Sequence, residues 1–132
     1  MIVAQKLECK AMKLKWLIPA IISSFLIVVI PAKAAETRCG WLINPTPANW
    51  YLKDKDGQWT ISLQGGYRAG GMNNIPPFND DEYVKTNVNY GYGCACLNVV
   101  IDRNRMRITT IQGGEQLSLS TCRKDPNLPK IS

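Results

Sequence analysis

The sequence predicts an all-β protein: a small antiparallel sheet or partly closed barrel with two hairpins, stapled by two disulfides, behind an N-terminal signal peptide. Three observations lead to this fold class. Two stretches, residues 50–63 and 97–110, space their apolar side chains as half-buried hairpins do, each around a polar turn. Residues 35–132 hold four cysteines, an even number typical of a small exported domain. No helical periodicity of useful length follows Ala35.

The first 34 residues have the parts of a signal peptide. A lysine-rich start leads into an apolar run of 15 residues, Trp16–Ile30, and then into the A-x-A site Ala32-Lys33-Ala34. We therefore expect cleavage after Ala34, with a leader over residues 1–34 and one small β domain over residues 35–132. The alternative, an uncleaved anchor, is disfavoured because a spanning helix needs about 20 apolar residues.

The leader also predicts where the protein works. Cys39 lies four residues past Ala35, so the cleavage site carries no cysteine that could take a lipid. We expect a periplasmic or secreted bacterial protein with no membrane anchor after cleavage. Either Met1 or Met12 suits the start of such a leader.

Most of the positive charge belongs to the leader. The chain has a formal net charge of +6, but residues 1–34 hold five lysines and one glutamate, so residues 35–132 keep only +2. Nucleic-acid binding needs a clustered basic patch on the folded domain. The charge balance therefore predicts no nucleic-acid partner.

The four cysteines of the domain, Cys39, Cys94, Cys96 and Cys122, are expected to form two disulfides. Residues two apart on a strand lie about 6.5–7 Å apart on the same side, at the limit of what a bridge spans. Cys94 and Cys96 should therefore each pair with either Cys39 or Cys122, and the sequence leaves open which. A four-thiolate metal site is disfavoured, because zinc ribbons use C-x₂-C pairs and this chain has C-x-C.

The first hairpin turns at Asp56-Gly57, a strong turn signal. A two-residue loop there places Leu52 opposite Ile61, whereas a four-residue loop places Leu52 opposite Trp59. Both registers put the same apolar side chains on one face, so the register stays open. These side chains are Trp50, Leu52, Trp59, Ile61 and Leu63.

The second hairpin has a more definite predicted register. A two-residue loop at Arg103-Asn104 keeps the apolar side chains on one face, because it pairs Ile101 with Met106, Val99 with Ile108 and Leu97 with Thr110. Cys94 and Cys96 have the opposite parity to Leu97, so they should point toward whatever covers the other face. The sheet should be packed on one face and stapled on the other.

The remaining segments give weaker signals. Residues 64–82 are predicted to form a loop, because they contain four glycines and the pair Pro76-Pro77. The stretch Glu115–Lys124 suits either a strand or a short helical turn.

Three blocks of sequence carry a resemblance to a known family. They are R-C-G-W with N-P-T-P and D-K-D-G-Q-W within residues 38–59, Y-G-Y-G-C-A-C-L at 90–97, and C-R-K-D-P-N-L-P at 122–129. With these blocks the chain resembles the uncharacterised exported bacterial family DUF4087, a domain of unknown function, over about residues 36–129. The resemblance implies export and four cysteines that act together, and it carries no activity.

The catalytic chemistry open to this chain is narrow. It has no histidine, which removes Ser-His-Asp and Cys-His nucleophiles and His-ligated metals. Its one acidic cluster, Asp80-Asp81-Glu82, is expected to be a solvated loop, because consecutive carboxylates do not converge on one point. Gly65-Gly66 and Gly70-Gly71 lack the Lys-Ser/Thr of a phosphate loop. We predict no catalytic residue, metal or cofactor.

The aromatic residues suggest a binding surface. Trp41 and Tyr51, with Asn44 and Asn49, could line a groove that stacks sugars or docks a peptide. Arg68 is a further candidate, because arginine is enriched at binding hot spots and this one lies off the core parity of the first hairpin. The alternative is that these rings simply pack in the core.

On these grounds we expect a non-enzymatic binding or inhibitor module that acts on an envelope protein or glycan not identified by the sequence. One alternative is a small hydrolase that uses carboxylates near Asp80–Glu82, and another is an inert structural envelope protein. A deep pocket joining acidic residues to tyrosine or arginine would favour the enzyme. A flat aromatic patch would favour binding.

Overall fold

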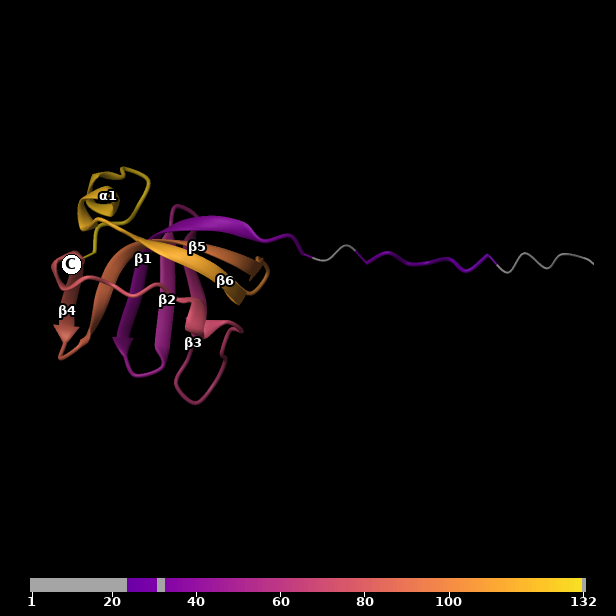
Figure 1. Ribbon diagram of the computed structural model, residues 1–132, viewed down its shortest axis with the longest axis horizontal. Coiled ribbons are helices and arrows are strands. Elements are labelled where there is room, and N and C mark those ends of the chain that lie inside the picture. The colour runs from indigo at the N-terminus through magenta and orange to yellow at the C-terminus, as the bar shows by residue number, and fades with distance from the viewer. Residues whose placement is uncertain (1–23, 31–32, 132) are drawn as a thin grey trace, which may run out of the picture. The chain divides into compact units, whose positions relative to one another are not determined.

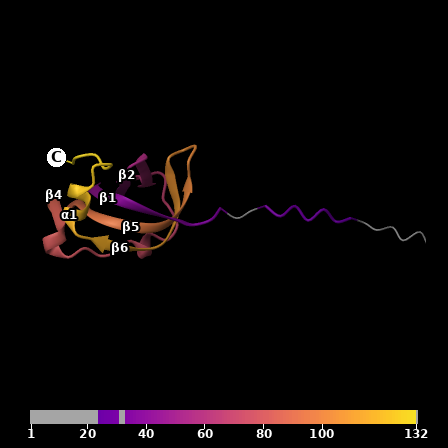
Figure 2. The ribbon, with the colours of Figure 1, turned by 90° about the horizontal axis from the view of Figure 1, so that it is seen from above.

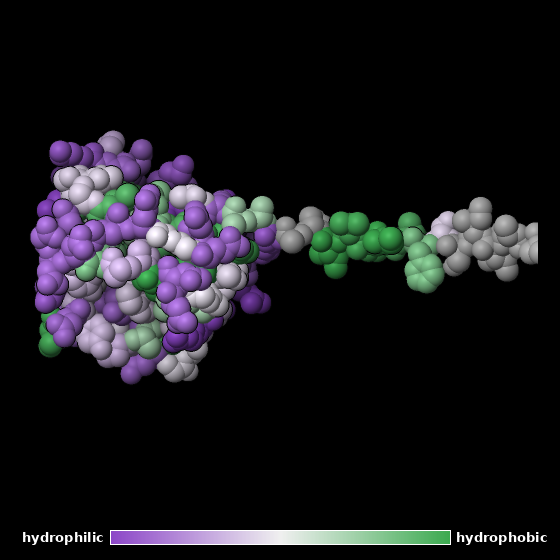
Figure 3. All heavy atoms as spheres, viewed as in Figure 1, coloured by the Kyte–Doolittle hydropathy of each residue, from purple (hydrophilic) through white to green (hydrophobic). Residues whose placement is uncertain are grey.

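The computed structural model describes residues 24–30 and 33–131. The chain divides into a unit that ends at Ile30 and a unit that begins at Pro31. Residues 24–30 have no regular secondary structure, and their apolar side chains are exposed (Figure 3). Lys33 and Ala34 of the predicted signal peptide are also described, whereas its residues 1–23 and 31–32 lie outside the described residues. Within the described parts of the chain we find no helix with the length and hydropathy of a membrane span.

The second unit is built mainly of β-strands, as the sequence predicts. Among residues 33–131, six strands are followed by one short helix, and two 3₁₀ turns, Met72–Asn74 and Asp80–Glu82, lie in the long segment before the fourth strand (Figure 1). The elements are β1 (Glu36–Thr46), β2 (Asn49–Asp54), β3 (Gly57–Ser62), β4 (Tyr83–Asn87), β5 (Tyr90–Asp102), β6 (Arg107–Leu117) and α1 (Leu119–Lys124).

The strands form a partly closed barrel. β1, β2 and β3 make an antiparallel meander, and β5 returns to lie beside β1, which is a Greek-key arrangement. β6 pairs antiparallel with β5 and meets β3 in parallel at one residue pair, Thr60 with Arg107 (Figures 1 and 2). A five-stranded, partly open Greek-key barrel is the architecture of the OB-fold. β4 lies outside this ring and extends it along the start of β5.

The first hairpin adopts one of its two predicted registers, with Leu52 opposite Trp59. The turn is tighter than a four-residue loop, because Asp54 already pairs with Gly57. A bulge then breaks the alternation, since Trp50 pairs with Ser62 while Tyr51 pairs with Thr60. As a result Ser62 is buried, and Leu63, which alternation placed with the core residues, is 37% exposed.

The predicted register of the second hairpin is wrong. Ile101 pairs with Ile108, and Val99 and Leu97 pair with Ile111 and Gly114. The loop spans four residues, 103–106, because the Asp102 carboxylate accepts hydrogen bonds from the next backbone N–H groups and wraps the chain around itself. Two further irregularities within β5 and β6 let Ile108 and Ile111, three residues apart, both reach the core.

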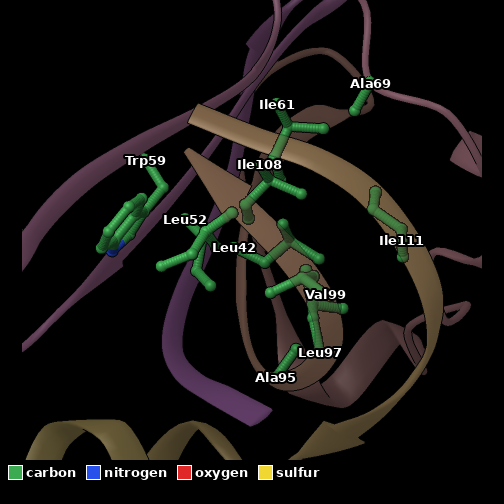
Figure 4. Packing of buried hydrophobic residues seen from close by; sticks show 11 residues of the cluster. Leu42, Leu52, Trp59, Ile61, Ala69, Ala95, Leu97, Val99, Ile108 and Ile111 are labelled. Atoms are coloured by element: carbon green, nitrogen blue, oxygen red, sulfur yellow. The ribbon is translucent and has the colours of Figure 1, made fainter. Parts of the chain in front are cut away.

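Two apolar clusters hold the unit together. The larger fills the barrel and draws on every strand of the ring; Figure 4 shows the Trp59 ring at one end of it. The smaller lies on the outer face of β1 and β5, beneath α1 and the segment that follows it. Its buried members are Trp41, Cys94, Leu119 and Cys122.

The disulfides are Cys39–Cys96 and Cys94–Cys122. Each joins one member of the Cys94/Cys96 pair to a distant cysteine, which confirms the predicted arrangement and settles the pairing. Cys39 lies directly opposite Cys96 on the neighbouring strand, and Cys122 is contributed by α1. The sheet is therefore packed on one face and stapled on the other, as the parity of β5 predicts.

Candidate binding groove

An open groove of about 400 Å³ lies at the end of the barrel where β1 finishes and β5 starts. Ligand sites typically combine apolar walls with a few placed polar groups, and this groove has both. Its aromatic residues are Trp50, Phe78 and Tyr83, its amides are Asn44 and Asn89, its charged residues are Asp80 and Lys85, and Pro76 and Pro77 complete it.

The glycines of the Y-G-Y-G block create the space for one wall of this groove. A methyl group on Gly93 would overlap the Phe78 ring, and one on Gly91 would overlap the Val84 carbonyl of β4. Side chains at these two positions would therefore push Phe78 and β4 away from β5. Phe78 instead packs down onto the barrel cluster, as Trp50 does, so both rings are supported from below.

Asn44 gives the groove a hydrogen-bond acceptor of fixed orientation. Its amide nitrogen donates to the backbone oxygens of Thr46 (2.9 Å) and Asn49 (2.8 Å), which uses both hydrogens. Because both partners are carbonyl oxygens, the nitrogen must face them and the amide oxygen must face the other way. Asn44 is only 8% exposed, and its amide oxygen accepts no hydrogen bond from the described residues. That oxygen is available to a ligand that offers an O–H or N–H.

Tyr83 adds a second polar group and stacks against its neighbour. Its ring lies 5.4 Å from that of Phe78, with the ring planes at 34°. Burial raises the pKa of the Tyr83 phenol, an effect only partly offset by a backbone hydrogen bond from Gly91. The phenol therefore stays protonated at neutral pH and can donate a hydrogen bond.

The turns on either side of the groove hold residues in an unfavourable backbone conformation. Ala48, between β1 and β2, has φ 60°, and Val88, between β4 and β5, has φ 54°. A positive φ is unusual for alanine and more so for a β-branched residue; Met106, in the β5–β6 turn outside the groove, also has one, at φ 52°. Val88 is also 80% exposed and adjoins Asn89 of the groove.

Of the five residues predicted to form a binding surface, only Asn44 lines the groove. Trp41 is 3% exposed; its indole N–H donates to the Pro129 oxygen at 3.0 Å and its ring meets Tyr92 edge to face at 5.4 Å. Trp41 is therefore a core residue, contrary to the surface position considered for it.

The other three candidates do not line the groove. Asn49 braces the β1–β2 turn, since its amide donates to the Thr46 hydroxyl and its oxygen accepts from the Gln64 backbone N–H. Tyr51 is half-buried on β2 and does not line the groove. Arg68 is exposed on the segment after β3.

The acidic cluster does not form a site of convergent carboxylates. The Glu82 carboxylate accepts a hydrogen bond from the Leu119 backbone N–H at 2.6 Å, which fixes the start of α1. Asp80 is the only member of the cluster that lines the groove. A groove with one carboxylate and several rings suits the holding of a ligand better than carboxylate-pair hydrolysis.

Fold and groove together define a disulfide-stapled Greek-key barrel with an aromatic cleft at one end. The chain belongs to the DUF4087 family, described as a protein of unknown function, whose model matches residues 33–129. No curated protein and no solved structure matches this chain.

Proposed function

We propose that this protein is an exported, non-enzymatic binding module that holds a component of the cell envelope in the aromatic groove. The observation that carries the proposal is the coincidence, in one open groove, of supported rings with an oriented acceptor. Rigid aromatic residues lose little freedom on binding and supply most of the energy of typical interfaces.

The proposed location in the periplasm or outside the cell rests on the leader pattern and the two disulfides, which persist in oxidising compartments. We expect the exported protein to begin at Ala35 and to carry no lipid. Its intact mass decides this. A mass that still includes Trp16–Ile30, or an added diacylglycerol, would contradict the proposed processing.

Tyr83→Ala is expected to weaken retention of the exported domain on isolated envelope by roughly tenfold or more, because a hot-spot aromatic is worth about 2 kcal/mol. The measurement is the amount of purified domain that sediments with envelope over a range of concentrations. The matched control is Tyr51→Ala, which removes a half-buried ring of the same kind outside the groove. Equal retention of wild type and Tyr83→Ala, or an equal loss in Tyr51→Ala, would show that the groove is not the binding site.

A further inference from the structure

We infer that the ligand of this groove is an uncharged glycan chain lying across the rings of Trp50, Phe78 and Tyr83. The inference rests on the proposed binding function and adds to it the chemical class of the ligand. Three properties of the groove lead to this class: its rings, its hydrogen-bonding groups and its charge.

The rings suit a ligand with flat apolar faces. The C–H face of a pyranose packs against an aromatic ring, and the hydroxyls of the sugar then lie at the edge of the stack. Trp50 and Phe78 both rest on the barrel cluster, so the platform is in place before the ligand arrives. The groove is open rather than enclosed, which accommodates a piece of a longer chain.

The polar groups suit hydroxyls. The amide oxygen of Asn44 has a fixed direction and accepts no hydrogen bond from the described residues, so it is free to accept one from a ligand. The neutral phenol of Tyr83 and the exposed amide of Asn89 can donate as well as accept. A sugar hydroxyl likewise does both, so a ring with hydroxyls at its edge can satisfy all three groups.

The charge of the groove argues against a polyanion. Its lining holds one carboxylate, Asp80, and one ammonium group, Lys85. Binding of a phosphate-bearing polymer depends on several lysines or arginines and weakens steeply with salt. A balanced groove has no such attraction, so binding should depend little on salt.

The neighbouring strand argues against an extended peptide. A peptide would most readily add to the free edge of β4, the outermost strand of the sheet. β4 has only five residues, carries the exposed Lys85, and has an irregular register before its turn. Short, charged and irregular edges are those that proteins use to prevent strand addition.

The test uses the exported domain and three preparations of envelope: untreated, digested with proteinase, and oxidised with periodate, which cleaves vicinal diols. Wild type, Tyr83→Ala, Trp50→Leu and the control Tyr51→Ala are compared on each. Among residues 35–132 the tryptophans are Trp41, Trp50 and Trp59. The first and last are buried, so their fluorescence shows whether each variant is folded.

If the inference holds, wild-type retention survives proteinase, falls at least about tenfold after periodate, and changes less than about twofold between low and high salt. Retention that is lost after proteinase, or kept after periodate, overturns the inference that the ligand is a glycan. The groove remains the binding site in that case if the groove variants still differ from wild type. A steep loss with salt points to a polyanion and also overturns it. If wild type and groove variants behave alike on untreated envelope, the proposed function itself fails.

Discussion

Asp54→Ala is expected to lower the free energy of unfolding by about 3–5 kcal/mol, because it leaves the buried cation of Arg38 without its buried carboxylate partner. The Arg38 Nε donates to an Asp54 oxygen at 2.5 Å, and the two residues are 6% and 4% exposed. Burial alone would lower the pKa of the Arg38 guanidinium. The hydrogen bond to Asp54 and the charge of Asp54, together with Asp56 and Glu36, outweigh this effect, so the pKa is raised. The guanidinium also lies 4.3 Å from the centre of the Trp59 ring. If the guanidinium moves, the packing of Trp59 in the barrel cluster is disturbed as well.

Urea unfolding of the oxidised protein measures the effect, and two further variants make it specific. Asp56→Ala removes another carboxylate of the same guanidinium, but the Asp56 side chain is 45% exposed, so we expect a cost under about 1 kcal/mol. Arg38→Met combined with Asp54→Leu should recover much of the loss, because an apolar pair can replace a buried ion pair. Equal effects of Asp54→Ala and Asp56→Ala would mean that burial of the pair is not what matters.

Trp41→Ala is expected to destabilise the domain as much as Trp59→Ala does, by about 3–5 kcal/mol each, since both remove a buried indole and leave a cavity. Trp41 is the largest residue of the outer cluster, where it lies beside the Cys94–Cys122 bridge and holds Pro129 through its N–H. Its loss should loosen the chain after α1 as well as lower the unfolding free energy.

The comparison variant for Trp41 is Tyr51→Ala, a half-buried ring on the next strand, which should cost clearly less. Proteolysis of the native state supplies a second readout, because the segment that covers Trp41 should become easier to cleave. A Trp41→Ala domain that unfolds at the wild-type urea midpoint would show that the outer cluster contributes little to stability.

Much of the fold follows from residue parity. The alternation of Leu97, Val99 and Ile101 identifies the barrel face of β5, and the opposite parity of Cys94 and Cys96 identifies the stapled face. The same reasoning extends to Trp41, which is two residues from Cys39 and shares its face, but only once residues 36–46 are known to form a strand. Asn44 and Pro45 obscured that strand, because both residues favour turns.

The registers could not be predicted because bulges decide them. Each bulge shifts one strand by a residue, and nothing in the composition around Ile61 or Thr109 marks the shift. The groove was missed for a related reason. Phe78 comes from the segment 64–82 that reads as a loop, and Tyr83 follows directly after it. Only the glycines at 91 and 93 signal that something must pack against β5 there.

The two bridges meet on one short stretch of β5, and this arrangement determines how the domain carries mechanical load. A pull on the two ends of the folded unit passes from β1 to Cys39, across to Cys96, back to Cys94, and across to Cys122. Residues 40–93 and 97–121 then form closed loops that bear no tension, and they contain β2, β3, β4, β6 and all the residues that line the groove. A cut anywhere in either loop leaves both pieces covalently joined. While the bridges remain oxidised, stretching can draw out little beyond the two ends of the chain.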